Sequence, residues 1–220
     1  VTDMVEELDL PDKDAARARL VSSIFVDTMA PSNNFFINPA ALKTFFETGG
    51  KSAVNGLQNL LKDMTENQGL PSSVDTSKFK VGENLAVTPG DVVYRNEVIE
   101  LVTYKPTTDK VYRRPLLVVP PQINKYYSID MSPGKSMIEF LLANGIQPYC
   151  VSWRNPTAEH ADWGMATYIE ALDQACDAAL EISGSDSVNI MGSCSGGITL
   201  STYAGWLAKN GHSDKINQVI

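Results

Sequence analysis

The chain has 220 residues, of which 43% are hydrophobic and 20% are charged, an ordinary composition for a globular protein of one or two domains. Its net charge of −8 at pH 7 argues against nonspecific nucleic-acid binding, but a local basic patch could still bind an anionic small molecule. No apolar run approaches the roughly 18 residues of a transmembrane helix, and no charged segment followed by an apolar one marks a secretory signal.

Residues 1–80 are predicted to form a helical region. Three helices are expected, over residues 11–30, 39–48 and 52–66. Pro11 suits the first turn of a helix, and Gly49-Gly50 suits the end of one. Apolar residues recur at helical spacing in all three helices. Because such stripes are normally buried, we expect them to pack in a core.

Residues 71–89 are polar and irregular, and they are interpreted as a connection to a second domain, residues 81–220. In that domain strands are expected over residues 91–95, 97–104, 116–119, 147–153, 188–191 and 216–220, and helices over 134–143, 163–182 and from 195 onward. Leu116–Val119 is a continuous apolar run, typical of a strand buried on both faces. The alternation predicts an α/β fold, a mostly parallel sheet with helices on both faces.

The segment Gly192-Ser193-Cys194-Ser195-Gly196-Gly197 lies between an apolar strand and a helix. Strand, tight turn and helix with a nucleophile at the turn form the nucleophile elbow of α/β-hydrolase folds, whose usual pattern is Gly-x-Ser-x-Gly. Glycines flank the nucleophile because a Cβ there would clash with nearby backbone. The pattern therefore predicts a truncated α/β-hydrolase fold. The alternative is a glycine-rich turn that holds a buried cysteine.

The position of Cys194 predicts its chemistry. A thiol in the first turn of a helix faces unpaired N–H groups and the positive end of the helix dipole, and both favour the thiolate. The backbone N–H of Ser195 can stabilise an oxyanion on an acyl group held by Cys194. Cys194 is thus the predicted nucleophile, with Ser195 as one oxyanion-hole donor.

The other two cysteines, Cys150 and Cys176, are expected to be buried and inert. The three cysteines match neither a metal-site spacing nor an even disulfide set. We therefore predict no metal, and a reducing cytoplasm suits the free nucleophilic thiol.

An acid and a histidine should follow the nucleophile in that order in this fold. Here His212 precedes Asp214, and His160 lies upstream of Cys194, where we expect it on the surface. We therefore expect the acid and the base beyond residue 220, in a longer protein whose N-terminal part this chain is. These 220 residues alone are expected to be inactive.

Three segments resemble the polyhydroxyalkanoate synthases: Pro120-Pro-Gln-Ile-Asn-Lys-Tyr-Tyr127, Val151-Ser-Trp-Arg-Asn-Pro156 and the cysteine elbow. The resemblance covers residues 81–220 and, less specifically, 11–70. The elbow sequence Ser-Cys-Ser and residues 163–172 look closest to the medium-chain branch.

The resemblance implies an acyltransferase that polymerises (R)-3-hydroxyacyl groups from coenzyme A into a polyester, through a thioester on Cys194. It implies a Cys-His-Asp triad, of which Cys194 is the matching position. Coenzyme A is then part of substrate and product, with no further cofactor. A homodimer at cytoplasmic polyester granules is expected, with no nucleic-acid partner and no transmembrane segment.

The loop at residues 120–124 follows the strand whose loop supplies the second oxyanion N–H in this fold, so the Ile123 backbone is the predicted second donor. Residues 124–127 have a direct role or pack the loop. Trp153, Arg154 and Asn155 are interpreted as a structured turn at a strand end.

Two other functions stay open. A cysteine esterase or thioesterase of the same fold would release free acid rather than polymer. A non-catalytic partner subunit would keep the elbow as scaffold, and its Cys194 would react with alkylating agents no faster than an ordinary surface cysteine.

Overall fold

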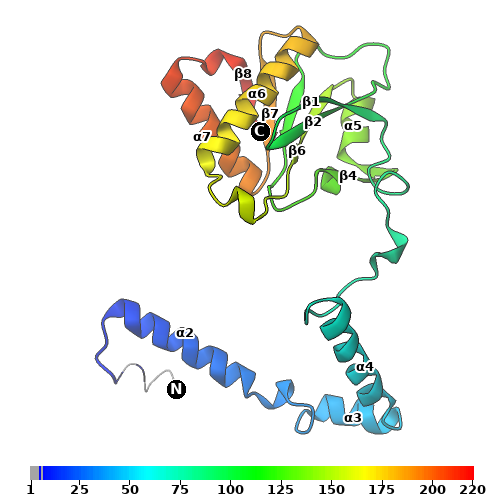
Figure 1. Ribbon diagram of the computed structural model, residues 1–220, viewed down its shortest axis with the longest axis vertical. Helices are drawn as coiled ribbons and strands as arrows, with labels where there is room; N and C mark the ends of the chain where they lie inside the picture. Colours follow the sequence, from blue (N-terminus) through cyan, green and yellow to red (C-terminus); the bar gives the residue numbers. More distant parts are fainter. Residues whose placement is uncertain (1–4, 6) are drawn as a thin grey trace. The chain divides into compact units, whose positions relative to one another are not determined.

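A computed structural model describes residue 5 and residues 7–220; residues 1–4 and 6, part of the predicted helical region, lie outside the described residues. The chain divides into two compact units, residues 1–75 and 76–220 (Figure 1). The boundary expected from the sequence lies at residues 80 and 81. No helix in the described part of the chain is long and apolar enough to cross a membrane.

The first unit contains the three predicted helices, α2 (Asp12–Thr28), α3 (Pro39–Glu47) and α4 (Lys51–Glu66), with a short 3-10 turn, η1 (Pro31–Asn33). The Asn38 side chain accepts hydrogen bonds from the backbone N–H groups of Ala40 and Ala41, which defines the start of α3. Gly50 has φ of 85°, a left-handed conformation that lets the chain turn from α3 into α4.

The predicted burial of the apolar stripes in this unit is wrong. None of the residues in α2, α3 and α4, all of which the structure describes, is buried. The exposed fraction is 62% for Phe25, 58% for Leu57 and 63% for Met64. Helical periodicity identifies which face of a helix is apolar, but it does not identify what covers that face.

The second unit contains a six-stranded sheet: β1 (Gly90–Arg95), β2 (Ile99–Tyr104), β3 (Leu116–Val119), β6 (Pro148–Trp153), β7 (Val188–Gly192) and β8 (Ile216–Val219). The strand order is β1-β2-β6-β3-β7-β8. The pairs β1–β2 and β2–β6 are antiparallel, and the other three pairs are parallel. The predicted mostly parallel sheet is confirmed.

Helices cover both faces of this sheet (Figure 1). Leu117 and Val119 of β3 pack in a core with α6 (Met165–Ser183) and α7 (Ser195–Asn210). Leu116 and Val118 face the other way and pack with α5 (Met137–Ala143). Because successive side chains of a strand point to opposite faces, all four residues of β3 are buried. With a cysteine turn between β7 and α7, this is an α/β-hydrolase fold.

Helix α5 is shorter than the sequence predicts. Residues 134–136 do not belong to it, because Lys135 and Ser136 form strand β5, which pairs with β4 (Asp130–Ser132). The Ser136 hydroxyl then accepts a hydrogen bond from the Glu139 N–H, so the helix starts after Ser136.

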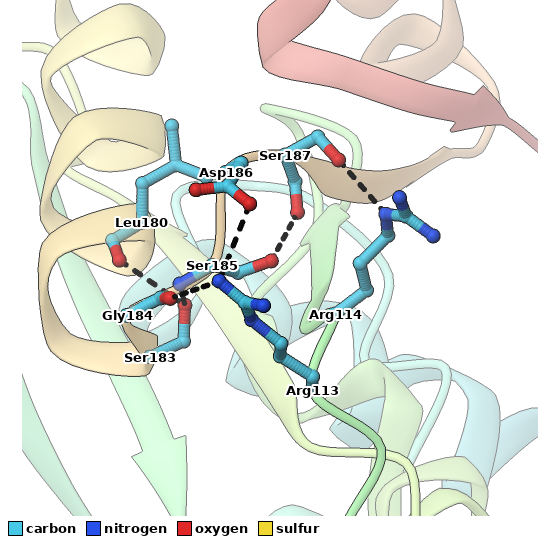
Figure 2. A network of polar contacts seen from close by, with 8 residues as sticks. All are labelled: Arg113, Arg114, Leu180, Ser183, Gly184, Ser185, Asp186 and Ser187. Atoms are coloured by element: carbon cyan, nitrogen blue, oxygen red, sulfur yellow. Dashed lines mark hydrogen bonds and ion pairs between the residues drawn. The ribbon is translucent and has the colours of Figure 1, made fainter.

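A polar network links the segment before β3 to the turn between α6 and β7 (Figure 2). Arg113 donates to the carbonyl oxygen of Gly184 and to Asp186, both at 3.2 Å, and Arg114 donates to the Ser187 hydroxyl at 2.8 Å. These contacts lie at the amino ends of β3 and β7.

A cavity of about 630 Å³ lies beside this network. It is lined by residues of the α5 side of the sheet and by none of the elbow residues 192–197. In α/β sheets ligands bind beyond the carboxyl ends of the strands, so this end is not the candidate site.

Candidate active site

Cys194 lies where strand β7 meets helix α7, at the carboxyl end of the parallel strands. Its thiol is exposed, and its backbone has φ of 52° and ψ of −126°. A non-glycine residue in this region is strained, typically by about 1–3 kcal/mol, and such strain is concentrated at functional sites. The predicted elbow is therefore present, and the alternative of a buried cysteine in this turn is wrong.

Two glycines make the elbow possible. A Cβ on Gly192 would lie 2.9 Å from the carbonyl oxygen of Gly196. A Cβ on Gly196 would overlap the carbonyl oxygen of Val119 and lie 2.7 Å from that of Pro120. Both contacts involve backbone atoms, which cannot move aside as a flexible side chain can. Because Gly196 has no side chain, the end of β3 lies directly against the first turn of α7.

The predicted oxyanion-hole donors come from these two segments. Ser195 is the first residue of α7, and Ile123 lies in a turn in which the Asn124 N–H donates to the Pro121 carbonyl oxygen at 3.0 Å. Within the described residues, neither the N–H of Ser195 nor that of Ile123 donates a hydrogen bond. Both groups are therefore available to an oxyanion.

Two further contacts link the loop after β3 to its surroundings. The Trp153 indole N–H donates to the Pro120 carbonyl oxygen at 2.7 Å, and the Gln122 amide donates to the Thr199 hydroxyl at 2.5 Å. The sequence reasoning identified neither contact. The bond from Trp153 to Pro120 gives Trp153 a structural role, as expected for a structured turn at the end of a strand.

The first two family-like segments lie together. Residues 125–127 and 152–155 line one cleft of about 580 Å³ beyond the end of β6, with Arg95 and residues of the β1–β2 turn. Arg154 and Asn155 are exposed, whereas Tyr126 packs against the cluster that contains Tyr104 and Cys150. Loop packing therefore accounts for Tyr126, whereas Lys125, Arg154 and Asn155 face solvent.

Cys150 and Cys176 are fully buried, as the sequence predicts. Burial raises the pKa of the Cys150 thiol to about 12 and that of Cys176 to about 11. Both thiols are therefore protonated at neutral pH and unsuited to nucleophilic attack.

The prediction that His160 is a surface residue is wrong. Its ring is buried, lies 4.2 Å from the Trp163 ring between centroids, and accepts a hydrogen bond from the Thr157 N–H at Nδ1. His212 follows the end of α7, and a 16-residue helix is about 24 Å long. Neither histidine hydrogen-bonds to Cys194 in the described part of the chain, so neither is placed as its base.

Comparisons with known proteins bear on the same residues. Residues 1–141 match a family model described as the poly-beta-hydroxybutyrate polymerase (PhaC) N-terminus. The chain is 49% identical to poly(3-hydroxyalkanoate) polymerase 1 of Ectopseudomonas oleovorans, over 98% of this chain and 38% of that protein. It is 42% identical to the poly(3-hydroxyalkanoate) polymerase subunit PhaC of Cupriavidus necator, over 96% of this chain and 36% of that protein. The chain thus spans somewhat more than a third of these relatives.

Among solved structures, the chain is similar to brefeldin A esterase, a bacterial homologue of human hormone sensitive lipase, with a TM-score of 0.43 and 20% identity over 64% of this chain and 42% of that one. It is also similar to an epoxide hydrolase from Vigna radiata, with a TM-score of 0.41 and 16% identity over 64% of this chain and 38% of that one.

Proposed function

The chain belongs to the poly-beta-hydroxybutyrate polymerase family, and we propose that it supplies the nucleophile and the oxyanion hole of a polyhydroxyalkanoate synthase. The substrate is a (R)-3-hydroxyacyl thioester of coenzyme A, and the products are a polyester and free coenzyme A. The observation that carries the proposal is the exposed thiol of Cys194, in strained backbone conformation at the start of α7.

The reaction takes place in two transfers. The Cys194 sulfur attacks the thioester carbonyl, and the resulting oxyanion is stabilised by the N–H groups of Ser195 and Ile123. When the tetrahedral intermediate collapses, its bond to the coenzyme A sulfur breaks, and the leaving thiolate takes up the proton that the Cys194 thiol lost on attack. A chain hydroxyl then attacks the Cys194 thioester, forms the ester and releases the Cys194 thiol. A general base must take the hydroxyl proton, and no histidine in the described residues is placed to do so.

A cysteine suits this reaction better than a serine. Transfer from one thioester to another changes the acyl energy little, so the acyl group on Cys194 stays activated for the next hydroxyl. A serine ester would lose that activation. Water competes with the hydroxyl, so a synthase must also exclude it from the intermediate.

Other properties follow as parts of the proposal. Coenzyme A enters with the substrate, and neither a further cofactor nor a metal is needed. The protein acts in the cytoplasm at the granule surface, as a homodimer, and prefers medium-chain substrates. Rates with 3-hydroxyoctanoyl-coenzyme A and 3-hydroxybutyryl-coenzyme A, compared in one preparation, test that preference.

The experiment that tests the function uses the intact protein with and without Cys194→Ala. Coenzyme A release and polymer are measured together by chromatography after incubation with a 3-hydroxyacyl-coenzyme A. We expect polymer from the wild type, none from Cys194→Ala, and wild-type activity from the matched variant Cys176→Ala if it folds. Free 3-hydroxy acid in place of polymer would instead establish a thioesterase. Polymer from Cys194→Ala would refute the nucleophile.

A further inference from the structure

A chain of hydrogen bonds connects the two candidate oxyanion segments. The Gln122 amide nitrogen donates to the Thr199 hydroxyl at 2.5 Å, and that hydroxyl donates to the Ser195 carbonyl oxygen at 3.1 Å. Thr199 is 1% exposed. Its single hydroxyl hydrogen is used toward Ser195, so it accepts from Gln122, and the direction of both bonds is fixed.

The ends of this chain are next to the predicted donors. Gln122 immediately precedes Ile123, and Ser195 carries the other donor N–H. On this basis we propose that Gln122 and Thr199 are positioning residues, which hold the Ile123 N–H at a fixed place relative to the Ser195 N–H. The inference rests on the proposed function, because it concerns the oxyanion hole of that reaction.

Other contacts do not replace this link. Packing of Gly196 and the bond from Trp153 hold the backbone only as far as Pro120. The turn at residues 121–124 has its internal bond from Asn124 to Pro121, and the Ile123 side chain is 84% exposed. Among the described residues, the Gln122 side chain makes the one side-chain hydrogen bond that joins this turn to α7.

Two polar atoms beside this chain of bonds are buried without a hydrogen-bond partner in the described part of the protein: Oε1 of Gln122 and Oγ of Ser195. Proteins rarely leave such atoms unpaired, because each costs about 1–3 kcal/mol. Both atoms are therefore free to accept or donate a further hydrogen bond beside the two predicted donors.

The test compares variants of the intact protein by the rate of coenzyme A release over a range of substrate concentrations. Thr199→Val keeps the shape of the side chain but removes the hydroxyl, whereas Thr199→Ser keeps the hydroxyl and removes only the methyl group. Removal of a whole oxyanion donor costs about 100–1,000-fold in rate, so a displaced donor should cost about 10–100-fold. We expect that loss in kcat for Thr199→Val, with KM changed less than about threefold, and near-wild-type kcat for Thr199→Ser.

Thr202→Val is the matched control. The Thr202 hydroxyl makes the same bond to the carbonyl oxygen four residues earlier in α7, at 2.8 Å to Ile198, but it is exposed and bonds to no loop residue among those that the structure describes. Its kcat should stay at the wild-type value. Equal loss in Thr202→Val and Thr199→Val would show an effect of helix stability and overturn the inference.

Gln122→Leu is a second variant that keeps the inference testable if Thr199→Val folds poorly, and where both fold a double-variant cycle joins them. Gln122→Leu alone should lower kcat like Thr199→Val, and the double variant should lose no more than either one, because both break the same link. Additive losses, or an unchanged kcat in both single variants, would overturn the inference. If Cys194→Ala retained polymer synthesis, the proposed function itself would fail, which is a different result from normal activity in Thr199→Val.

Discussion

The indole nitrogen of Trp153 donates a 2.7 Å hydrogen bond to the carbonyl oxygen of Pro120, so the end of β6 holds the end of β3 beside the elbow. Both residues are buried. Trp153→Phe keeps most of the ring packing but leaves a buried carbonyl oxygen without its donor. We expect the free energy of unfolding to fall by about 1–3 kcal/mol, measured by urea titration.

Trp163→Phe is the control for this change. The indole nitrogen of Trp163 makes no hydrogen bond within the described residues, although its ring packs on His160 and Tyr168. A loss for Trp163→Phe as large as that for Trp153→Phe would attribute the effect to ring size rather than to the hydrogen bond.

Gly196→Ala should disrupt the elbow. Its Cβ would meet the backbone carbonyl oxygens of Val119 and Pro120, which can move only if β3 moves. Overpacking of this kind costs about 1–3 kcal/mol. Gly205→Ala lies in the same helix, and its Cβ would meet nothing within 4 Å, so it should stabilise α7 by up to about 1 kcal/mol. Melting temperatures that shift the same way in both variants would contradict the structure of the elbow.

Lys215, the residue directly before β8, takes part in a polar cluster with residues of α6 and α7. Its ammonium group lies 2.8 Å from Asp173 and 2.6 Å from Asp177, both on α6, and Asp173 also accepts from the Tyr203 hydroxyl of α7 at 2.8 Å. Burial lowers the pKa of Lys215, but the hydrogen bonds and the charge attraction to Asp173 and Asp177 together raise it by more, so the net pKa lies above the ordinary 10.5.

The sign of the pH dependence follows from that shift. A pKa raised on folding gives stability that is fully present below pH 10.5 and is lost as pH rises through the folded pKa. Lys215→Met should therefore be about 1.5–3 kcal/mol less stable than the wild type at pH 8, the usual size of a charged hydrogen bond. The difference should shrink in urea titrations above pH 10.5.

Asp186→Asn is the control for the ion pairs of Lys215 with Asp173 and Asp177. Asp186 pairs with Arg113 at 3.2 Å, but its side chain is 93% exposed (Figure 2). Exposed pairs of this kind contribute about 0–1 kcal/mol. A constant difference between Lys215→Met and the wild type from pH 8 to 11 would mean that packing of the lysine stem, not its charge, stabilises the cluster.

The three cysteines should differ sharply in reactivity. Iodoacetamide reacts with thiolates, and Cys194 is exposed, whereas burial raises the pKa of Cys150 to about 12 and of Cys176 to about 11. Mass spectrometry of the native protein at pH 8 should find Cys194 labelled at least about 100-fold faster, and all three labelled in urea. Labelling of Cys194 no faster than a free model thiol would favour the non-catalytic alternative.

The elbow was predictable from the sequence because its constraints are local. The apolar strand before Cys194, the helix pattern after it and the glycines at 192 and 196 all lie within one short stretch of sequence. The glycines are required because a Cβ at either position would meet backbone atoms. The mostly parallel sheet was predictable for the same reason, since alternating strand and helix patterns permit few topologies.

The contacts that position the loop after β3 were not predictable. Gln122 and Thr199 are 77 residues apart, and neither has a pattern that marks it. The predicted surface position of His160 is wrong because its ring packs on Trp163 and caps the turn at Thr157, two contacts that no sequence pattern marks. The exposed stripes of α2 to α4 show the same limit, because a helix pattern contains no information about its partner.

The division of the chain into a helical region and a sheet domain gives the last prediction. Residues 71–80 are exposed throughout, whereas residues 86–88 are linked to β4: the Ala86 N–H donates to the Asp130 carbonyl oxygen at 2.9 Å and the Thr88 hydroxyl to the Asp130 carboxylate at 2.6 Å. Cleavage by a nonspecific protease requires local opening, so brief subtilisin digestion should cut within 71–85 before it cuts within 116–119. Asp130→Ala should extend the early cuts through 86–88, while Glu83→Ala, which removes only an exposed pair with Lys80, should not. An early cut within 116–119, mapped by mass spectrometry, would mean that β3 is not the buried strand on which the elbow rests.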